Sequence, residues 1–421
     1  MLSVILITAL LSTAVTLVML NLMSGVHRLL HRPRRLYTLR DGDFRRAMGV
    51  LLGPAILPGN EVVTLTNGDG IFPPMLAAIR AARHSICFET FIYWSGQIGE
   101  EFARALAEAA RRGVKVHVLF DWVGTRRRAP LLLKELRASG VQVQLYHELS
   151  WLYLLRMNNR THRKLLIVDG VLGFTGGAGI APQWQGNAQD PQHWRDTHFQ
   201  VRGPVVAQMQ AVFLDNWIKA TGNVLHGEQY LPPLEAAGEM DAQMFGSSPS
   251  GGSENMQLMF LLAITAARRS IEITSSYFVP DGMTIGALVD AANRGVVVRI
   301  LVPGHYNDVP LARRASRARW GRLLRAGVAI FEYQPTMIHC KIAVIDGYWT
   351  TVGSANFDNR SFRLNDEANL NVFSDALAEE QQRQFEQDLA LSRRVSLRAW
   401  RRRPPWERLQ EAVIVLLRSQ L

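Results

Sequence analysis

The pattern histidine, any residue, lysine, four residues, aspartate occurs twice in this chain of 421 residues. The two copies consist of His162, Lys164 and Asp169, and of His339, Lys341 and Asp346. Lysine is rare in this chain, because only five of its 47 lysine and arginine residues are lysines. Two of those five lie inside the repeated pattern. These two positions therefore require a compact ammonium group rather than the planar fork of arginine.

Each copy continues into a short apolar run, Leu165–Val168 or Ile342–Ile345, which predicts a buried strand closed by an aspartate and a turn. Residues two apart on a strand point to the same face, so each histidine shares a surface with the lysine of its own copy. A neutral imidazole can attack phosphorus or transfer a proton, while an ammonium group binds the phosphate oxygens. Two copies supply one histidine as nucleophile and another as general acid and base.

The doubled motif resembles the signature of the phospholipase D superfamily, and the resemblance runs from about Phe72 to about Leu389. Within the superfamily the chain is most similar to bacterial cardiolipin synthases. The segments that carry this closer resemblance are Glu89–Tyr93, Trp194–His198, Ser276–Pro280 and Gly353–Asp358.

An internal duplication is visible outside the motifs as well. Ala81–Ile86 corresponds to Ala266–Ile271, and Arg112–Val116 corresponds to Arg294–Val298. Each half is predicted to run helix, strand, helix, strand and then the motif strand, which is an α/β pattern. The resemblance implies two similar phospholipase D-like α/β halves packed about a pseudo-twofold axis, with one active site between them.

The N-terminal residues up to Val26 contain no charged side chain and are long enough to span a bilayer. No basic segment precedes them, so a transmembrane helix is predicted rather than a cleaved signal peptide. The basic residues that follow predict a cytoplasmic location for the catalytic region. The predicted segments are a transmembrane anchor (1–26), a basic juxtamembrane linker (27–60), a first half (61–237), a glycine- and serine-rich linker (238–255), a second half (256–395) and a basic and apolar C-terminal helix (396–421).

A catalytic imidazole needs an acceptor that fixes its tautomer. The candidates are Asp196, which follows the first histidine along the chain, and Glu367, which follows the second; the alternative for each is a surface carboxylate. Asp169 and Asp346 belong to the catalytic motif, but an aspartate at the end of a strand commonly caps a turn. We therefore expect them to support the site rather than react.

Small residues after each motif are the candidates for phosphate binding, namely Gly177 in the first half with Ser354 and Asn356 in the second. Asn356 matches an asparagine that contacts phosphate in the superfamily. The superfamily usually has an asparagine in the first half too, where this chain has Gly179. Gly179 offers no side-chain amide, so that half of the phosphate site must use backbone groups, water or another residue.

The resemblance implies phosphatidyl transfer through a phosphohistidine intermediate. His162 is the expected nucleophile and His339 the expected acid and base, with two phosphatidylglycerol molecules giving cardiolipin and glycerol. No cofactor or metal is implied, because lysine and histidine supply the charge neutralisation that a metal ion would give. The alternatives are hydrolysis, transfer to another alcohol such as serine, and a nuclease activity. A non-enzymatic scaffold that binds anionic lipid would need a broken motif, whereas both copies are intact.

The formal net charge of +11 indicates an anionic partner, either nucleic acid or acidic lipid. The apolar N-terminus favours anionic phospholipid and the membrane, and no obligate protein partner is inferred. The expected location is the bacterial inner membrane, crossed once. An arginine-rich helix over residues 313–325 is either a solvated face or a headgroup contact. Trp151–Leu155, ahead of the first motif, belong either to the core or to a hydrophobic lip of the site.

Overall fold

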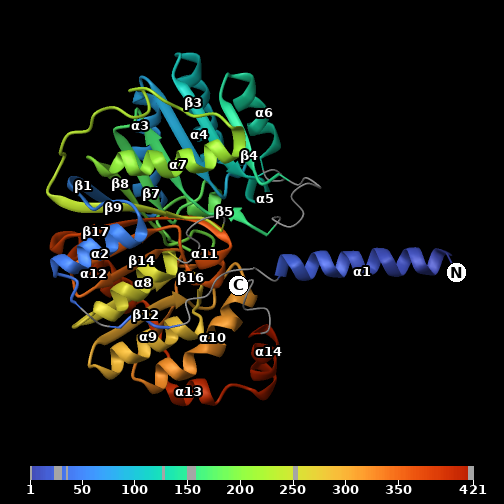
Figure 1. Cartoon of the computed structure of the whole chain (residues 1–421), viewed down its shortest axis with the longest axis vertical. Coiled ribbons are helices and arrows are strands. Elements are labelled where there is room, and N and C mark those ends of the chain that lie inside the picture. Colours follow the sequence, from blue (N-terminus) through green and yellow to red (C-terminus); the bar gives the residue numbers. More distant parts are fainter. Residues whose placement is uncertain are drawn as a thin grey trace.

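The computed structural model describes residues 2–22, 31–34, 37–125, 129–148, 158–249 and 255–415. The first half of the chain forms the upper part of the view in Figure 1, and the second half forms the lower part. The hydrophobic lip predicted at Trp151–Leu155 lies outside the described residues.

The first half is a sheet with the strand order β1-β8-β7-β6-β2-β3-β4. Strands β2, β3 and β4 are parallel, and the other neighbouring strands pair in antiparallel fashion. Its elements are β1 (Leu57–Thr66), α3 (Asn67–Ala81), β2 (Ser85–Thr90), α4 (Gln97–Arg111), β3 (Lys115–Asp121), α5 (Trp122–Thr125), α6 (Pro130–Ala138), β4 (Gln142–Tyr146), β5 (Arg160–Thr161), β6 (Leu165–Val168), β7 (Leu172–Gly176), η2 (Pro182–Trp184), β8 (Thr197–Arg202) and α7 (Val205–Thr221).

The second half repeats this arrangement with the strand order β9-β17-β15-β14-β10-β12-β13-β18, in which β10, β12 and β13 are parallel. Strands β11 and β16 form a separate pair. Its elements are β9 (Met240–Ser247), α8 (Asn255–Ala266), β10 (Ser270–Ser275), β11 (Phe278–Val279), α9 (Gly282–Asn293), β12 (Val297–Pro303), α10 (Pro310–Arg325), β13 (Ala329–Tyr333), β14 (Lys341–Ile345), β15 (Trp349–Gly353), β16 (Phe357–Asp358), α11 (Asn359–Arg363), β17 (Asn365–Phe373), α12 (Asp375–Ala390), β18 (Ser392–Arg394), α13 (Leu397–Arg401) and α14 (Pro405–Val415).

The two halves join through β1 and β9, which pair in antiparallel fashion at Leu57 with Ala242 and at Asn60 with Met240. Among the described residues the result is one continuous sheet of 16 strands. Strand β9 lies inside the predicted linker 238–255, which is a difference from the sequence prediction. The glycine and serine residues of that stretch gather after its apolar residues, and Ala242, Met244 and Phe245 are buried in the sheet.

The predicted juxtamembrane linker 27–60 also contains regular structure, since it includes α2 (Gly42–Leu52) and the start of β1. Phe44, Met48 and Leu52 are spaced by four residues, and this spacing buries them on one face of α2. The predicted C-terminal helix is two helices, α13 and α14, which are separated before Pro405. Proline suits the first turn of a helix but not its interior.

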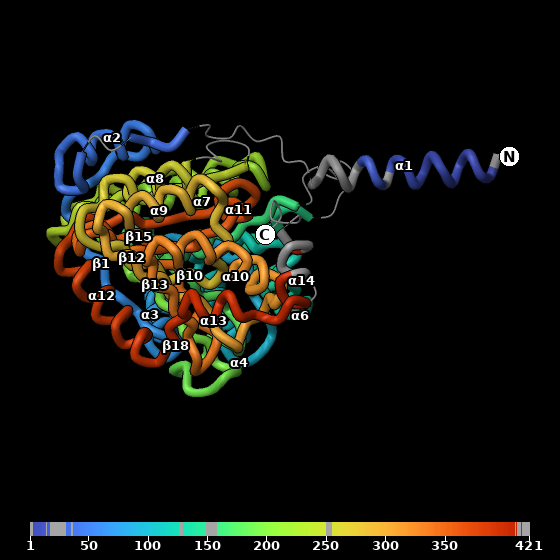
Figure 2. The backbone as a smooth tube through the Cα atoms, turned by 90° about the horizontal axis from the view of Figure 1, so that it is seen from below, coloured from blue at the N-terminus to red at the C-terminus, as the bar shows by residue number. Residues whose placement is uncertain are grey.

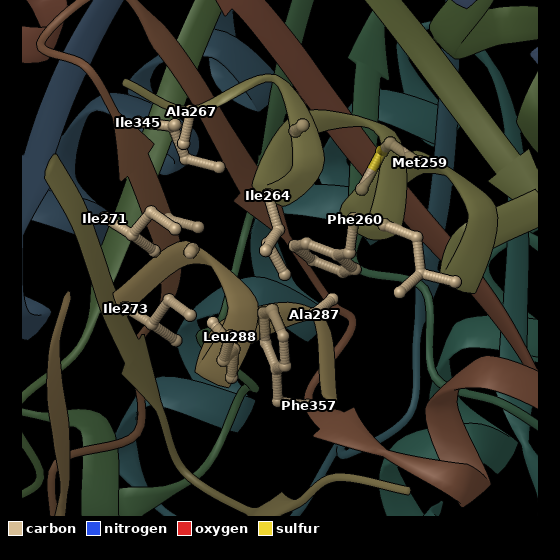
Figure 3. Packing of buried hydrophobic residues seen from close by; sticks show 14 of the residues in the cluster. Met259, Phe260, Ile264, Ala267, Ile271, Ile273, Ala287, Leu288, Ile345 and Phe357 are labelled. Carbon is tan, nitrogen blue, oxygen red and sulfur yellow. The ribbon is translucent and has the colours of Figure 1, made fainter. Parts of the chain in front are cut away.

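Each half has its own hydrophobic core, and a third core spans the junction. Figure 3 shows part of the second-half core, where Phe260 and Ile264 of α8 pack beside Leu288 of α9 and Ile273 of β10. The core at the junction combines Phe213 and Trp217 of α7 with residues of both halves. The halves are therefore packed against each other as well as hydrogen-bonded.

Helix α1 (Leu2–Leu22) projects away from the rest of the molecule in both Figure 1 and Figure 2. Large apolar side chains along it are exposed, including Val4, Ile5 and Leu10. Within the described ranges, no helix reaches both the length and the apolar character that crossing a membrane requires.

Candidate active site

The backbone of the opposite half holds each motif histidine. Strand β5 pairs in parallel with β17, and the His162 N–H donates to the carbonyl oxygen of Asp366 at 2.8 Å. In the other copy the His339 N–H donates to the carbonyl oxygen of Arg195 at 2.7 Å. The motif histidines therefore meet at the junction between the two halves.

The same crossing sets the carboxylate partner of each imidazole. His162 Nδ1 lies 3.0 and 3.1 Å from the two carboxylate oxygens of Glu367, and His339 Nδ1 lies 2.8 Å from Asp196 Oδ2. Both carboxylates are fully buried. The structure thus brings together both predicted carboxylates and both histidines. Each carboxylate serves the histidine of the opposite half, although along the sequence it follows the histidine of its own half.

Neighbouring groups hold these carboxylates in place. Glu367 accepts hydrogen bonds from the Ser354 hydroxyl and, at 3.2 Å, from Asn365 Nδ2. Asp196 accepts a hydrogen bond from Trp184 Nε1 at 2.8 Å. A Cβ atom at Gly177 would lie 2.2 Å from Asp196 Oδ1, so only glycine leaves room for this carboxylate. Ser354 and Gly177, which the sequence analysis assigned to phosphate, therefore act on the carboxylates.

The two motif lysines lie beside their own histidines. Lys164 Nζ donates to the carbonyl oxygen of His162 at 2.7 Å. Lys341 Nζ donates to the carbonyl oxygen of His339 at 2.6 Å and to the Ser276 hydroxyl at 2.7 Å. It also lies 3.1 and 3.2 Å from the two ring nitrogens of His339.

Burial and neighbouring charge determine the protonation of the site. Burial, supported by Lys164 and opposed by Glu367, lowers the pKa of His162 to about 4. Burial and the Lys341 charge also lower the pKa of His339. Burial and Lys341 lower the pKa of Lys164 to about 7. Both imidazoles are therefore neutral near pH 7, and Nδ1 donates to a carboxylate, so that Nε2 carries the lone pair.

The carboxylates remain ionised despite their burial. Burial acts to raise the pKa of Glu367, but His162 and Lys164 outweigh it and lower the pKa below its ordinary value. Burial likewise acts to raise the pKa of Asp196, and His339 and Lys341 reverse its effect. A buried carboxylate that stays charged can stabilise the imidazolium that forms during a proton transfer.

A cavity of about 280 Å³ opens onto the two histidines. Phe91 packs against His162, and Trp184 and Trp194 pack against His339, at ring-centroid distances of 5.2–5.5 Å. The side chains that line the cavity are those of Phe91, Ile92, Arg160, His162, Lys164, Trp184, Trp194, Tyr277, Val279, Asp308, Val309, Ala312, His339, Asn356, Asp358, Arg360, Ser361 and Asn365.

Asn356 is the predicted phosphate ligand that does line the cavity, and its Oδ1 atom is buried without a partner among the described residues. The position of Gly179 is filled by other side chains. A Cβ atom there would lie 3.0 Å from Ile92 Cβ and 3.2 Å from the indole of Trp184. Trp184 therefore occupies space that a side chain at position 179 would need.

The motif aspartates lie at the far end of their strands from the histidines, and neither lines the cavity. Asp169 and Gly170 both have positive φ angles, as do Asp346 and Gly347, and such angles belong to tight hairpin turns. The carboxylate of Asp169 accepts hydrogen bonds from the backbone N–H groups of three residues that lead into β2, and Asp346 does the same before β10. Their place in the catalytic motif reflects the turn that closes the motif strand.

Several residues of the cavity were not singled out as site residues from the sequence. Trp184, Tyr277 and Asp308 carry no recognisable motif of their own, although Tyr277 lies in a segment of the family resemblance. Arg160 and Arg360 were hidden among the many arginines of the chain. The nearest signal was their spacing, two residues before the first histidine and four residues after Asn356.

Comparison with known proteins agrees with this geometry. Residues 75–213 and 260–389 match the family model described as cardiolipin synthase, PLD-like domain. Cardiolipin synthase A of Pseudomonas fluorescens (strain SBW25) is 38% identical over 357 residues, covering 83% of this chain and 73% of that protein. Cardiolipin synthase of Geobacillus kaustophilus is 35% identical over 361 residues, covering 85% of this chain and 72% of that protein.

A solved structure with the same fold is the phosphatidylserine synthase of Haemophilus influenzae Rd KW20, with a TM-score of 0.69 and 12% identity. The match covers 90% of this chain and 100% of that chain. At this identity the likeness concerns the fold alone. The family model and the two cardiolipin synthases together show that the chain belongs to the cardiolipin synthase family of proteins with phospholipase D-like domains.

Proposed function

We propose that the protein is a phosphatidyltransferase that makes cardiolipin and glycerol from two molecules of phosphatidylglycerol. The observation that carries this proposal is the pair of buried, neutral imidazoles in one cavity, each with a carboxylate on Nδ1 and a lysine beside it. This arrangement provides a nucleophile, a general acid and base, and cations for the phosphate oxygens. The names of the related proteins support the same reaction.

In the first step His162 Nε2 attacks the phosphorus of the donor lipid, and the bond from phosphorus to the glycerol oxygen breaks. His339, protonated when the phosphodiester anion binds, gives its proton to the departing glycerol. In the second step His339 takes a proton from the hydroxyl of the acceptor lipid. The resulting alkoxide attacks the phosphohistidine, releases His162 and forms cardiolipin.

The choice of His162 as nucleophile is supported by a difference between the two imidazoles. Nε2 of His339 lies 3.2 Å from Lys341 Nζ, whereas Nε2 of His162 has no hydrogen-bond partner in the part of the chain that the structure describes. A lone pair that is not engaged is the better nucleophile. Lys164, Lys341 and Asn356 bind the phosphate oxygens in this proposal.

The test is an incubation of the purified protein with labelled phosphatidylglycerol in mixed micelles and a chelator, followed by separation of the lipid products. Cardiolipin and glycerol from the wild type, and neither from His162→Ala, are expected. Phosphatidate in their place would identify a hydrolase, and a product only with added serine would identify transfer to that alcohol. A wild type that is inert towards lipid but cleaves DNA would favour the nuclease activity.

We further propose that residues 1–26 anchor the enzyme in the bacterial inner membrane as a single span, with the catalytic region on the cytoplasmic side. Two observations support this location. Large apolar side chains of α1 are exposed along a helix that projects from the molecule, and the substrate of the proposed reaction is a membrane lipid. Basic residues follow the apolar segment, as on the cytoplasmic side of membrane spans.

A further inference from the structure

Two arginines from different halves share one side of the active-site cavity. Arg160 belongs to β5 and Arg360 to α11, and both line the cavity together with His162 and Lys164. The side chain of Arg160 is only 9% exposed. The transfer chemistry described above uses the two histidines, the two lysines and Asn356, so it assigns no task to either arginine.

The local structure holds the two guanidinium groups close together. Arg360 donates from Nη1 to Asn158 Oδ1 at 3.0 Å and from Nη2 to the Asn158 carbonyl oxygen at 2.9 Å, which ties it to the chain just before Arg160. Arg160 donates to the carbonyl oxygen of His147 at 3.2 Å. Burial lowers the pKa of Arg360, Asp358 opposes this change, and the charge of Arg160 lowers the pKa further.

The carboxylates near the pair also bind backbone N–H groups. Asp121 lies 4.0 Å from Arg160 and accepts hydrogen bonds from the N–H groups of Val123, Gly124 and Thr161. Asp358 accepts a hydrogen bond from the Ser361 N–H at the start of α11. Two like charges in a buried position favour the binding of an anion, and guanidinium groups match the geometry of a phosphodiester.

The arginine pair also breaks the internal symmetry of the site. Met337 stands two residues before His339, where Arg160 stands two residues before His162. Gln183 stands four residues after Gly179, where Arg360 stands four residues after Asn356. One reacting phosphorus needs the duplicated histidines and lysines. An arginine pair without a counterpart indicates a second anion that binds on one side only.

The pair lies at a suitable distance for such an anion. Residues two apart on an extended segment are separated by about 6.6 Å, and Arg160 and His162 are two apart. In cardiolipin the two phosphorus atoms are joined by six bonds through the central glycerol, which span roughly 7 Å when extended. An acceptor whose hydroxyl reaches the reacting phosphorus can therefore place its own phosphodiester against the arginines.

We propose that Arg160 and Arg360 bind the phosphodiester of the acceptor lipid and so select phosphatidylglycerol over water and neutral alcohols as acceptor. This inference rests on the proposed function. It assigns the arginines a role in acceptor specificity, whereas donor binding and phosphohistidine formation remain with the histidines, the lysines and Asn356.

The test is a competition between two acceptors. The full-length protein is given labelled phosphatidylglycerol in mixed micelles with a fixed concentration of ethanol, and labelled cardiolipin and phosphatidylethanol are measured together. In Arg360→Gln and Arg160→Gln the ratio of cardiolipin to phosphatidylethanol is expected to fall about 10- to 100-fold, the effect of losing charge-assisted hydrogen bonds. Because both products come from one phosphohistidine, the ratio does not depend on how much protein is folded.

Two control variants separate specificity from structure. Arg111→Gln removes an exposed arginine of α4 and should leave the ratio unchanged. Asn158→Ala removes the side-chain oxygen that Arg360 contacts but keeps both guanidinium groups, so the ratio should stay within about threefold of the wild type. An equal loss of both products in the arginine variants would overturn the inference in favour of donor binding. A full loss of selectivity in Asn158→Ala would overturn it in favour of a structural role.

The outcome for the wild type tests the underlying function separately. A wild type that forms phosphatidylethanol but no cardiolipin would refute the proposed synthesis of cardiolipin, whatever the variants do. A wild type that forms cardiolipin, with arginine variants that keep its product ratio, would refute only the role of the arginine pair.

Discussion

At the scale of single residues, the two imidazoles differ in the task that their carboxylates support. Glu367 lies 205 positions along the chain from His162, yet it accepts from His162 Nδ1 and fixes the tautomer of the proposed nucleophile. Glu367→Gln should reduce the single-turnover rate of phosphohistidine formation by about 10²- to 10⁴-fold, because an amide no longer specifies the tautomer or stabilises the imidazolium. Trapping of labelled enzyme by rapid quench measures this rate, and Glu379→Gln on the exposed face of α12 is the matched control.

Asp196→Asn should affect a different step, since Asp196 supports the proposed acid and base His339. Phosphohistidine formation from phosphatidylglycerol should slow, but formation from a donor with a nitrophenol leaving group, which needs no proton, should remain within about tenfold of the wild type. Rapid-quench rates with the two donors measure the difference. If Glu367→Gln shows this dependence on the leaving group and Asp196→Asn does not, the roles of the two histidines must be exchanged.

The pH dependence of the free enzyme should reflect Lys164. Its pKa is lowered to about 7 by burial and by Lys341, so the ammonium is charged below about pH 7 and is lost as the pH rises. His162, with its pKa lowered to about 4, is already neutral in this range. We expect kcat/KM for phosphatidylglycerol to fall between pH 6 and 9, and Lys164→Arg to lower the activity but move the fall to higher pH, because arginine stays protonated. A profile that is level over this range in the wild type would contradict the assignment.

At the scale of the elements, each motif aspartate joins two strands. The Asp346 carboxylate accepts from the N–H groups of Arg268, Arg269 and Ser270 and so fixes the start of β10 beside the turn that ends β14. Asp346→Ala leaves three N–H groups without their acceptor, and a loss of about 2–4 kcal/mol in the free energy of unfolding is expected. Denaturant unfolding measures the loss, with Asp375→Ala on exposed α12 as control. Loss of phosphohistidine formation at unchanged stability would instead place Asp346 in the chemistry.

Much of the element pattern could be predicted from the sequence because local residue types determine it. The apolar runs after Lys164 and Lys341 are β6 and β14, and the arginine-rich stretch is α10, as predicted. Strand β9 was missed because glycine and serine residues dominate the end of its segment. The exchange of carboxylates between the halves could not be predicted, since sequence distance does not show that His162 and His339 each pair with the backbone of the opposite half.

At the scale of the whole molecule, the paired backbone segments around β5 and β17 explain why the duplicated sequence makes a single site. Each half provides a histidine and the carboxylate that the other half's histidine requires. The continuous sheet through β1 and β9 and the core shared at the junction fix the distance between them. A site built in this way depends on the relative position of the halves, which are rigidly packed, while α1 lies apart from this assembly (Figure 2).

Because α1 contributes no side chain that lines the cavity, its removal should separate membrane attachment from catalysis. A variant without residues 2–30 should move from the membrane pellet to the supernatant after carbonate washing of cell fractions, since the exposed apolar side chains of α1 are the proposed anchor. Its kcat in detergent micelles should stay within about threefold of the wild type, because the histidines, lysines and carboxylates remain in place. The matched control replaces residues 2–22 with an unrelated apolar span, which should restore the pellet fraction. Retention of the truncated protein in the pellet would instead assign membrane binding to other surfaces, with the arginine-rich helix α10 as the first to examine.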